Sequence, residues 1–343
     1  MKIAVLAGGL SPERDVSLSS GTMACNALLS LGHQAILIDL FFGLPDWDGK
    51  TDLFRSAAPL PANRVSEQEP DLDALRRTRP VGYNDYIGLN VPEICRQADI
   101  VYMALHGDCG ENGELQSFFD AQGIRYTGSG ALGCRNAMDK WISKQIFREN
   151  GILTPHGVRL FRDQPFDPDA LPIPCVVKPC SGGSSIGVSI VTERGKLADA
   201  IALAFSLEPD ILVEEYIRGR ELSCGVLGDT ALPPIEIIPL SGFYDYKNKY
   251  QAGASKEVTP APIGDENTRR IQEAAEKVFR VLGLSVYGRV DFLMTEAGAF
   301  YCLEANTLPG MTPTSLLPQE AAVVGYSYPQ LCETIIRLSL ECR

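Results

Sequence analysis

A lysine followed by a glycine- and serine-rich stretch is the sharpest chemical signal in this sequence. Lys178, Pro179 and Cys180 lead into Ser181–Gly187, which reads SGGSSIG. Glycines let backbone N–H groups approach phosphate oxygens, hydroxyls add hydrogen-bond donors, and lysine adds a compact positive charge. The order differs from the GxxxxGK[ST] loop, because the lysine comes first and no helix clearly follows. The stretch predicts a phosphate-binding loop, and an unliganded hairpin or surface loop fits the same letters.

A second candidate site combines carboxylate and amide side chains from two expected neighbouring strands. Gly288–Asp291 is followed along the chain by Glu304–Asn306. If the strands pair antiparallel, Asp291, Glu304 and Asn306 meet at one end of the sheet as all-oxygen ligands that suit magnesium. Isolated carboxylates on edge strands are more often solvated. Here Asp291 and Glu304 lie inside apolar runs, where an unpaired charge is costly, so the sequence favours a metal site.

A third polar stretch carries no chemical signal by its spacing alone. Glu214–Ile217 ends one expected strand, and Arg218–Glu221 begins the next. The pattern indicates a strand, a turn and a strand.

Composition bounds the class of protein. The chain has 343 residues, 45% of them hydrophobic, which is enough to bury the cores of two or three domains. The 43 acidic and 31 basic residues give a net charge of -12, which argues against a nucleic acid or an anionic membrane as the main partner. The apolar start Met1–Leu6 is too short for a signal peptide, and no later apolar run approaches ~20 residues, so we expect a cytoplasmic protein. The ten cysteines lack CxxC or Cys/His spacing and are expected to be reduced, mostly buried thiols.

The elements that must position these groups fall into three expected units, 1–128, 129–218 and 219–343. The first opens with a strand, a helix and a strand, which indicates a parallel sheet. Its expected elements are the strand Lys2–Ala7, the helix Asp15–Leu31, the strand Gln34–Leu40, the strand Asp99–Leu105 and a helix that ends at Gln122. Between Phe41 and Asn90 proline and charge interrupt the pattern, so we expect loops and short helices there.

The second and third units mix strands and helices. In the second we expect a helix at Asn136–Asn150, strands at Cys175–Lys178 and Ile211–Ile217 with another between them, and a helix at Arg194–Leu207. In the third we expect the strands Glu221–Gly228, Pro234–Leu240, Tyr287–Met294 and Ala299–Ala305. Helical spacing of Ile271, Ala275, Val278, Phe279 and Leu282 predicts a helix before the last two strands, and helices around Gln319 and at Pro329–Leu340 close the chain.

Taken in order, these stretches resemble the D-alanine:D-alanine ligases of the ATP-grasp superfamily over almost the whole chain. The matching motifs are Gly8–Ser17, Leu105–Gly107 with Gly110–Gly113, Tyr126–Ser129, Met138–Lys140, the tyrosine-rich loop Phe243–Tyr250, and Leu303–Leu316. The resemblance implies an α/β fold, with an N-terminal parallel-sheet domain followed by two α+β domains that clasp ATP. Phe41–Asn90 is longer than in compact members of the family, and nothing carries over to it.

The resemblance also implies a role for each matching residue. For ATP, Lys140 and Lys178 would hold the phosphates, Ser184 and Ser185 would cap them, Glu214, Glu215 and Ile217 would contact adenine, and Glu221 the ribose. Asp291, Glu304 and Asn306 would bind two Mg²⁺ ions, for which Mn²⁺ could substitute. For the substrates, Glu13 would fix the ammonium of the first D-alanine, and Ser315 and Leu316 the carboxylate of the second. Arg289 and the Gly310 N–H would face the oxyanion, His106 would act on the substrate side of the cleft, and Lys249 and Tyr250 would belong to a mobile lid.

The implied reaction is the ATP-dependent joining of two D-alanines through an acyl phosphate, for peptidoglycan and cell wall synthesis. Relatives that make D-alanyl-D-lactate or D-alanyl-D-serine are the nearest alternative, and Tyr250 favours the dipeptide-forming type. Another ATP-grasp ligase with a different acid and amine is a further alternative. A catalytically silent nucleotide-binding protein would lack some of the charged set, and Lys178, Arg289 and Asp291 are all present. The resemblance suggests a homodimer.

Overall fold

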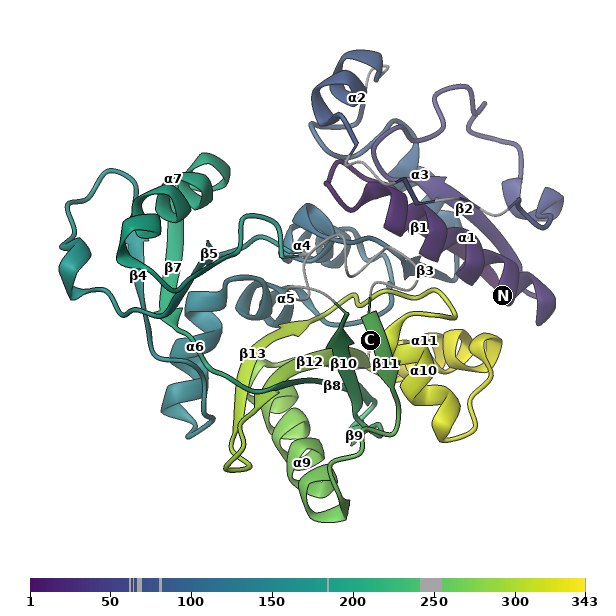
Figure 1. Ribbon diagram of the computed structural model, residues 1–343. Coiled ribbons are helices and arrows are strands. Elements are labelled where there is room, and N and C mark those ends of the chain that lie inside the picture. The colour runs from purple at the N-terminus through teal and green to yellow at the C-terminus, as the bar shows by residue number, and fades with distance from the viewer. Residues whose placement is uncertain are drawn as a thin grey trace.

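The computed structural model describes residues 1–61, 63, 65–66, 70–79, 82–183, 185–240 and 255–342 (Figure 1). Its N-terminal sheet has the strand order β2-β1-β3 and is parallel throughout. The strands are β1 (Lys2–Ala7), β2 (Gln34–Asp39) and β3 (Ile100–Met103). The near-continuous apolar letters of β1 fit a strand that is covered on both faces, and Ile3 to Ala7 are fully buried. The predicted parallel sheet is confirmed.

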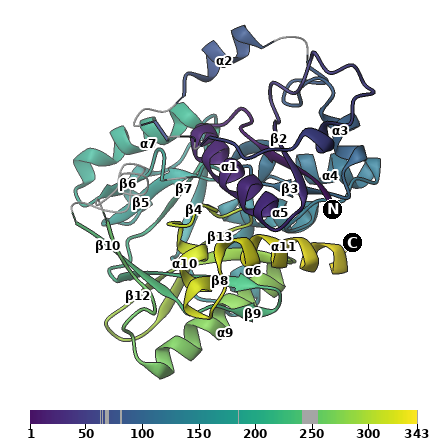
Figure 2. The ribbon, with the colours of Figure 1, turned by 90° about the vertical axis from the view of Figure 1, so that its right-hand side faces the viewer.

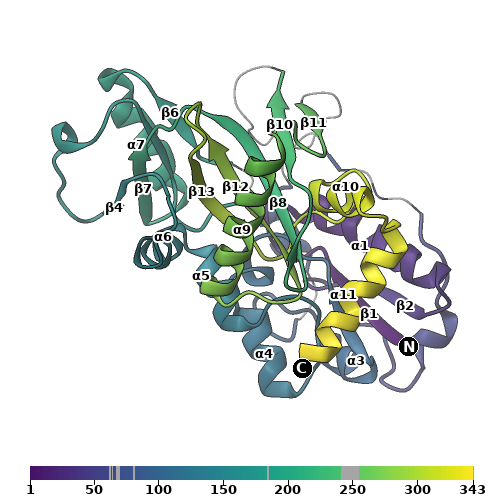
Figure 3. The ribbon, with the colours of Figure 1, turned by 90° about the horizontal axis from the view of Figure 1, so that it is seen from below.

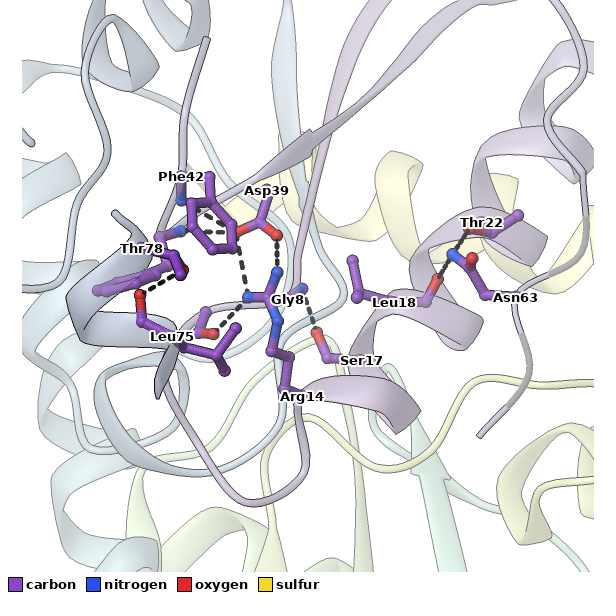
Figure 4. Close-up of polar contacts among 12 residues, drawn as sticks. Gly8, Arg14, Ser17, Leu18, Thr22, Asp39, Phe42, Asn63, Leu75 and Thr78 are labelled. Carbon is purple, nitrogen blue, oxygen red and sulfur yellow. Dashed lines mark hydrogen bonds and ion pairs between the residues drawn. The ribbon is translucent and has the colours of Figure 1, made fainter. Parts of the chain in front are cut away.

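Helices surround this sheet. They are α1 (Arg14–Ser30), α3 (Val91–Gln97) and α4 (Glu114–Gln122), with a short 3-10 turn η2 (Asp108–Gly110) between β3 and α4. The stretch before α3 contains η1 (Leu53–Ser56) and α2 (Leu72–Thr78), as the expected loops and short helices. It is tied to α1 by the amide of Asn63, which donates to Thr22 Oγ1 at 2.8 Å (Figure 4).

A second sheet is antiparallel, with the order β4-β7-β5-β6. Its strands are β4 (Gly157–Phe161), β5 (Cys175–Pro179), β6 (Ser189–Val191) and β7 (Asp210–Glu215). Helix α7 (Leu197–Leu207) packs on β5 and β7 through Leu197, Ile201 and Ala204, after the turns η3 (Pro168–Ala170) and η4 (Arg194–Lys196). The sequence analysis missed β4, and it extended the helix α7 over the turn η4.

The third sheet has the order β11-β10-β8-β12-β13, with β9 paired to β8. Its strands are β8 (Arg220–Leu227), β9 (Thr230–Ala231), β10 (Ile235–Pro239), β11 (Ser255–Val258), β12 (Tyr287–Met294) and β13 (Phe300–Asn306). Helix α9 (Asp265–Leu282) covers it with the five apolar side chains predicted from helical spacing, all buried. The strands β9 and β11 were not predicted.

The expected helix Asn136–Asn150 is in fact two helices, α5 (Ala131–Met138) and α6 (Lys140–Glu149). Asp139 between them has an extended backbone, with ψ 104, which ends α5. Its side chain accepts the N–H groups of Trp141 at 2.9 Å and Ile142 at 3.0 Å, and so caps α6. This break makes Lys140 the first residue of α6.

The three expected units do not have wholly separate cores. Phe147 of α6 packs with Phe279 and Leu282 in the core of the third sheet. The closing helices α10 (Leu316–Val323) and α11 (Tyr328–Cys342) contribute Leu317, Leu331 and Ile335 to the core of the N-terminal sheet (Figures 2 and 3). The division at 128 and 218 therefore stays a proposal, supported by the fact that each sheet lies within one range.

Two general expectations can be compared with the structure. All ten cysteines are free thiols, and all but Cys342 are buried, as predicted. In the part of the chain that the structure describes, no helix is both long and apolar enough to span a membrane.

Candidate functional site

A cavity of about 430 Å³ lies between the second and third sheets. Apolar side chains from both sheets, among them Val176, Ile190 and Leu293, form part of its wall. Its charged lining includes Lys140 and Lys178 together with several carboxylates, among them Glu221. A cavity with apolar walls and two lysines can hold a flat ring that carries an anionic chain.

Lys178 belongs to a buried group of three charges at the wall of this cavity. Its Nζ lies 2.5 Å from Glu214 Oε1, and Lys144 Nζ lies 2.7 Å from Glu214 Oε2. Burial opposes the charge of Glu214, but the two lysines outweigh it and lower the pKa of this carboxyl group. Lys144 also donates to Thr154 Oγ1 at 2.8 Å and to Pro155 O at 2.7 Å. Glu214 thus lies between the two lysines and contacts Lys178 with one carboxylate oxygen and Lys144 with the other.

Lys144 was not singled out from the sequence, although a signal was present. It follows Lys140 by four residues, so both lysines lie on the same face of α6. Lys144 is fully buried, and burial lowers its pKa to about 8. Lys140 instead reaches the cavity, where its Nζ lies 2.5 Å from Gly182 O and 3.4 Å from Glu304 Oε2.

The structure brings together the three residues proposed as metal ligands. Asp291 of β12 is opposite Glu304 of β13, and Arg289 is opposite Asn306. Arg289 holds Asp291 through two hydrogen bonds, from Nε to Oδ1 and from Nη2 to Oδ2, both at 2.9 Å. Asn306 donates to Asp291 Oδ2 at 3.1 Å, and Ser223 donates to Asp291 Oδ1 at 2.7 Å.

The donor set of this cluster can be tested against magnesium. Among the described residues, no group of three or more His, Cys, Asp or Glu side chains is placed to hold a metal ion. Two carboxylates, Asp291 and Glu304, need the amide oxygen of Asn306 as a third donor. Because all three donors are oxygens, the set fits the ligand preference of a hard cation such as Mg²⁺, and a metal bond to Asp291 would replace one of the four hydrogen bonds that this carboxylate accepts.

A second cavity, of about 420 Å³, adjoins the first. Its wall includes Glu13, His106, Arg289, Ser315 and the segment Leu308–Gly310. Glu304 and Gly183 line both cavities, so the acidic cluster and the glycine-rich loop lie where the two meet. Val65 also lines the second cavity, and it belongs to the stretch 41–90, to which the family resemblance assigned no role.

Glu13 is the N-cap residue of α1, and two glycines, Gly107 and Gly183, pack closely against its carboxylate. A Cβ atom on Gly107 or on Gly183 would come within 2.9 Å of Glu13 Oε2, so both neighbours must be glycine for the carboxylate to lie there. Gly107 also has a φ of 68°, in the left-handed region that favours glycine.

The first turns of α1 are anchored from both sides. Ser17 Oγ accepts the Gly8 N–H at 2.8 Å and donates to Ala104 O at 2.7 Å. Figure 4 shows Arg14 pointing to Asp39, with which it forms a buried ion pair. These contacts join α1 to the ends of β1, β2 and β3 and so set the position of Glu13.

Helix α10 begins at the opposite part of the second cavity. Ser315 is its N-cap residue and Leu316 its first residue, and both line the cavity. Ser315 Oγ accepts the Thr312 N–H at 3.1 Å, which keeps the approach to the helix compact. The unpaired N–H groups at a helix N-terminus suit a carboxylate.

His106 lines the same cavity but is engaged through both ring nitrogens. Nδ1 lies 2.8 Å from Leu308 O, and Nε2 lies 3.1 Å from Ser20 Oγ. Burial lowers the pKa of His106 and outweighs the opposing effects of the Glu13 carboxylate and of the hydrogen bond to Leu308. The neutral ring therefore links α1 to the segment after β13.

Glu111 is a further charged residue of this cavity to which the sequence analysis assigned no role. Its Oε2 accepts the Gly107 N–H at 2.6 Å, and its Oε1 accepts the Leu308 N–H at 3.2 Å. Burial, followed by the nearby charge of Glu13, raises the pKa of Glu111 to about 7. Its place in the motif Gly110–Gly113 was the only signal in the sequence.

Of the remaining predicted site residues, some line one of the two cavities and the others lie outside the described part of the chain. Ser185, Glu215 and Ile217 line the first cavity, and Gly310 and Leu316 line the second. Ser184, Lys249 and Tyr250 lie outside the described residues.

Comparison with known proteins supplies an independent finding. Residues 2–129 match the family described as D-ala D-ala ligase N-terminus, and residues 167–337 match D-ala D-ala ligase C-terminus. The D-alanine--D-alanine ligase of Pediococcus pentosaceus is 47% identical over 343 residues, covering 98% of this chain and 97% of the relative. The enzyme of the same name from Lacticaseibacillus casei is 43% identical over 350 residues, covering 99% and 96%.

Solved structures agree with these relatives. The crystal structure of D-alanine--D-alanine ligase from Bacillus anthracis complexed with ATP matches with a TM-score of 0.77 and 29% identity, and covers 100% of this chain and 98% of that one. A second structure of that ligase matches with the same TM-score of 0.77 and 32% identity.

Proposed function

This chain belongs to the D-alanine--D-alanine ligase family, and we propose that it joins two D-alanines into D-alanyl-D-alanine, a cell wall precursor, with conversion of ATP to ADP and phosphate. The observation that carries this proposal is the junction of the two cavities at Glu304 and Gly183. A phosphate chain in the first cavity would end where the carboxylate of an amino acid in the second begins. That contact is what phosphoryl transfer between the two requires.

ATP would occupy the first cavity. The resemblance and the lining residues support phosphate binding by Lys140, Lys178 and the loop that contains Ser184 and Ser185. The adenine would lie along Glu214–Ile217, with Glu221 at the ribose. Because the net charge of the chain is -12, the negative charge of the phosphates must be offset locally, and Lys140 and Lys178 would do this.

Asp291, Glu304 and Asn306 would hold the magnesium that accompanies ATP. When bound, Mg²⁺ supplies charge neutralisation on the phosphate oxygens during transfer. The contacts of Arg289, Asn306 and Ser223 with Asp291 hold this carboxylate at the junction.

The second cavity would hold the two amino acids. Glu13 would pair with the ammonium of the first D-alanine, whose carboxylate attacks the γ-phosphorus of ATP and releases ADP. The resulting acyl phosphate is attacked at its carbonyl carbon by the amine of the second D-alanine, whose carboxylate would lie at Ser315 and Leu316. Arg289 and the Gly310 N–H would stabilise the tetrahedral oxyanion before phosphate leaves.

Other parts of the assignment stay predictions. They are a lid role for Lys249 and Tyr250, a homodimeric assembly, a cytoplasmic location, and the choice of D-alanine over D-lactate or D-serine as second substrate. Water must be kept from the acyl phosphate, which is the physical reason to expect a lid.

The test is phosphate release with Mg-ATP and D-alanine, D-serine or D-lactate, singly and in pairs, with products identified by mass. We expect D-alanyl-D-alanine, with one phosphate released per peptide bond. A Glu304→Gln variant should fold as the parent does and lose most of this turnover, since it removes one charge at the junction. Phosphate release that requires a different acid or amine would overturn the choice of substrates, and a parent that releases none would overturn the activity.

A further inference from the structure

The segment Leu308–Met311 forms part of the second cavity and contains Gly310, to which the proposed function assigns an oxyanion donor. Its first residue is held at both backbone polar groups. Leu308 N–H donates to Glu111 Oε1 at 3.2 Å, and Leu308 O accepts from His106 Nδ1 at 2.8 Å. Both partners are side chains from the loop that follows β3, far away in the sequence.

The last residue of this segment is held in the same manner. Met311 N–H donates to Ser20 Oγ of α1 at 3.4 Å, and Met311 O accepts the hydroxyl hydrogen of Tyr328 of α11. Pro309 and Gly310 therefore lie between Leu308 and Met311. The backbone N–H and C=O of both flanking residues form hydrogen bonds with side chains.

Hydrogen-bond chemistry fixes the direction of one of these links. Leu308 O can only accept, so the hydrogen of neutral His106 is on Nδ1 and its Nε2 is an acceptor. Ser20 lies 3.1 Å from Nε2 and therefore donates its hydroxyl hydrogen to it, which leaves a lone pair of Oγ for the Met311 N–H. His106 and Ser20 thus connect the two ends of the segment through a closed chain of hydrogen bonds.

We propose that Ser20, His106, Glu111 and Tyr328, named here the loop clamp, are positioning residues that hold the Gly310 peptide so that its N–H faces the tetrahedral oxyanion. This proposal rests on the proposed ligase function. A Cβ atom on Gly310 would come within 2.8 Å of Ser315 Oγ and would displace this side chain, which favours glycine here, and glycine by itself is conformationally free. An oxyanion donor is effective only when its position is set before charge develops, so the freedom of Gly310 must be restricted by its neighbours.

The clamp also explains why His106 and Glu111 are polar at the wall of the cavity. Both side chains use their hydrogen-bonding atoms within the protein: His106 contacts Leu308 O and the Ser20 hydroxyl, and Glu111 accepts the N–H groups of Gly107 and Leu308. Their role in the reaction is then to shape the segment. This differs from the direct substrate contact that the resemblance suggested for His106.

Ser20 and Tyr328 allow the sharpest test, because the described wall of the second cavity is built without them. Ser20→Ala removes the link between His106 and Met311, and Tyr328→Phe removes the donor to Met311 O while it keeps the ring. An effect on catalysis must therefore pass through the groups that they hold, the segment and, for Ser20, also His106. Ser30→Ala, on the same helix, and Tyr326→Phe, just before α11, are matched controls outside the clamp.

Three quantities would be measured for parent, variants and controls: kcat with KM for both substrates, the affinity for a phosphinate analogue of the tetrahedral adduct in the presence of ATP, and amide hydrogen exchange of the peptide that contains Met311. We expect kcat to fall about 10- to 100-fold and the analogue affinity to fall by a similar factor, with KM for ATP within about threefold. Exchange at Met311 should become about tenfold faster in Ser20→Ala, since one protecting hydrogen bond is lost. The controls should match the parent in all three.

The possible outcomes separate the two proposals. An active parent whose Ser20→Ala and Tyr328→Phe variants keep both kcat and the analogue affinity would overturn the clamp and leave the ligase function standing. An equal loss of affinity for ATP, substrate and analogue would show a general structural role and would also overturn it. Exchange at Met311 is read without turnover, so unchanged protection in Ser20→Ala counts against the clamp even if the parent proves inactive, a result that would overturn the ligase function separately.

Discussion

At the scale of single residues, the site depends on charges that hold other charges in place. Lys178 faces the first cavity and lies 2.5 Å from buried Glu214, which in turn lies 2.7 Å from Lys144. Two lysines and one carboxylate leave one net positive charge, directed at the cavity. Glu214 alone would be a poorly placed anion beside ATP phosphates, and Lys144 offsets that charge from the protein side.

Lys144→Met tests this arrangement. The variant keeps the volume of the side chain but leaves Lys178 as the one lysine that contacts Glu214. The negative charge of Glu214 then offsets the charge of Lys178, and the attraction between Lys178 and a phosphate becomes weaker. We expect KM for ATP to rise about tenfold and the free energy of unfolding to fall by about 3 kcal/mol, as when one partner of a buried ion pair is removed. Steady-state kinetics and urea unfolding measure the two effects, with exposed Lys196→Met as the matched control. Parent values for both would show that Lys144 has no influence on Lys178.

At the scale of elements, a buried carboxyl group fixes the helix α10 against the strand β8. Glu320 is fully buried, and its Oε2 accepts the Gly225 N–H at 3.0 Å. A Cβ atom on residue 225 would come within 2.6 Å of that oxygen, so this approach of helix to strand requires glycine. The contact matters for function because α10 begins at Ser315 and Leu316, the proposed carboxylate site.

The charge state of Glu320 gives a pH dependence of stability. Burial raises the pKa of Glu320 well above its usual value. The unfolded chain releases this proton near pH ~4.3, whereas the folded protein keeps it to higher pH. The stability that Glu320 contributes is therefore fully present below about pH 4.3 and is lost as pH rises toward the folded pKa, by at most about 1.4 kcal/mol per pH unit.

Glu320→Gln removes this titration and keeps the shape of the side chain. As the pH rises above about 5 we expect the variant to gain stability relative to the parent until the folded pKa of Glu320 is reached, measured as the difference in free energy of unfolding in urea. Glu273→Gln, on the exposed part of α9, is the matched control. A difference that stays constant over this range would mean that Glu320 is already ionised in the folded protein.

At the scale of the whole molecule, the chain closes back on its beginning. Helix α11, at residues 328–342, contributes Leu331, Ile335 and Ile336 to the core that contains β1 and β3. The N-terminal sheet, which carries the loop with His106 and Glu111, is thus covered by the last helix of the chain. The two sides of the second cavity share one hydrophobic core.

Ile335→Ala is predicted to destabilise the N-terminal sheet and the helix α11 together, because they share one core. It leaves a cavity in the shared core and should lower the free energy of unfolding by about 2 to 5 kcal/mol, in one cooperative transition. Ile190→Ala, at a side chain that is 36% exposed, should change stability by less than about 1 kcal/mol. Urea unfolding followed by circular dichroism and by tryptophan fluorescence checks both. Separate transitions in the two probes would indicate that the N-terminal sheet and the helix α11 unfold independently.

Much of this protein could be predicted from local patterns. The strands Lys2–Ala7 and Tyr287–Met294 begin and end where apolar runs predicted them, and α9 buries the side chains that helical spacing selected. Pairing of adjacent strands also brought Asp291 opposite Glu304 as expected. Such features depend on neighbours within a few residues or on consecutive strands, and their periodicity is visible in the letters.

Only the tertiary structure decided the rest. Asp139 ends one helix and caps the next, a choice that depends on its extended backbone and not on the apolar pattern on either side. The contacts of Lys144 with Glu214, and of His106 and Tyr328 with the segment Leu308–Met311, join residues on different elements. No spacing rule encodes such pairs, because they form when separate elements pack and each buried polar group must find a partner wherever the fold supplies one. The sequence by itself determined which chemical groups are present and on which elements they lie, and packing determined which of them act on one another.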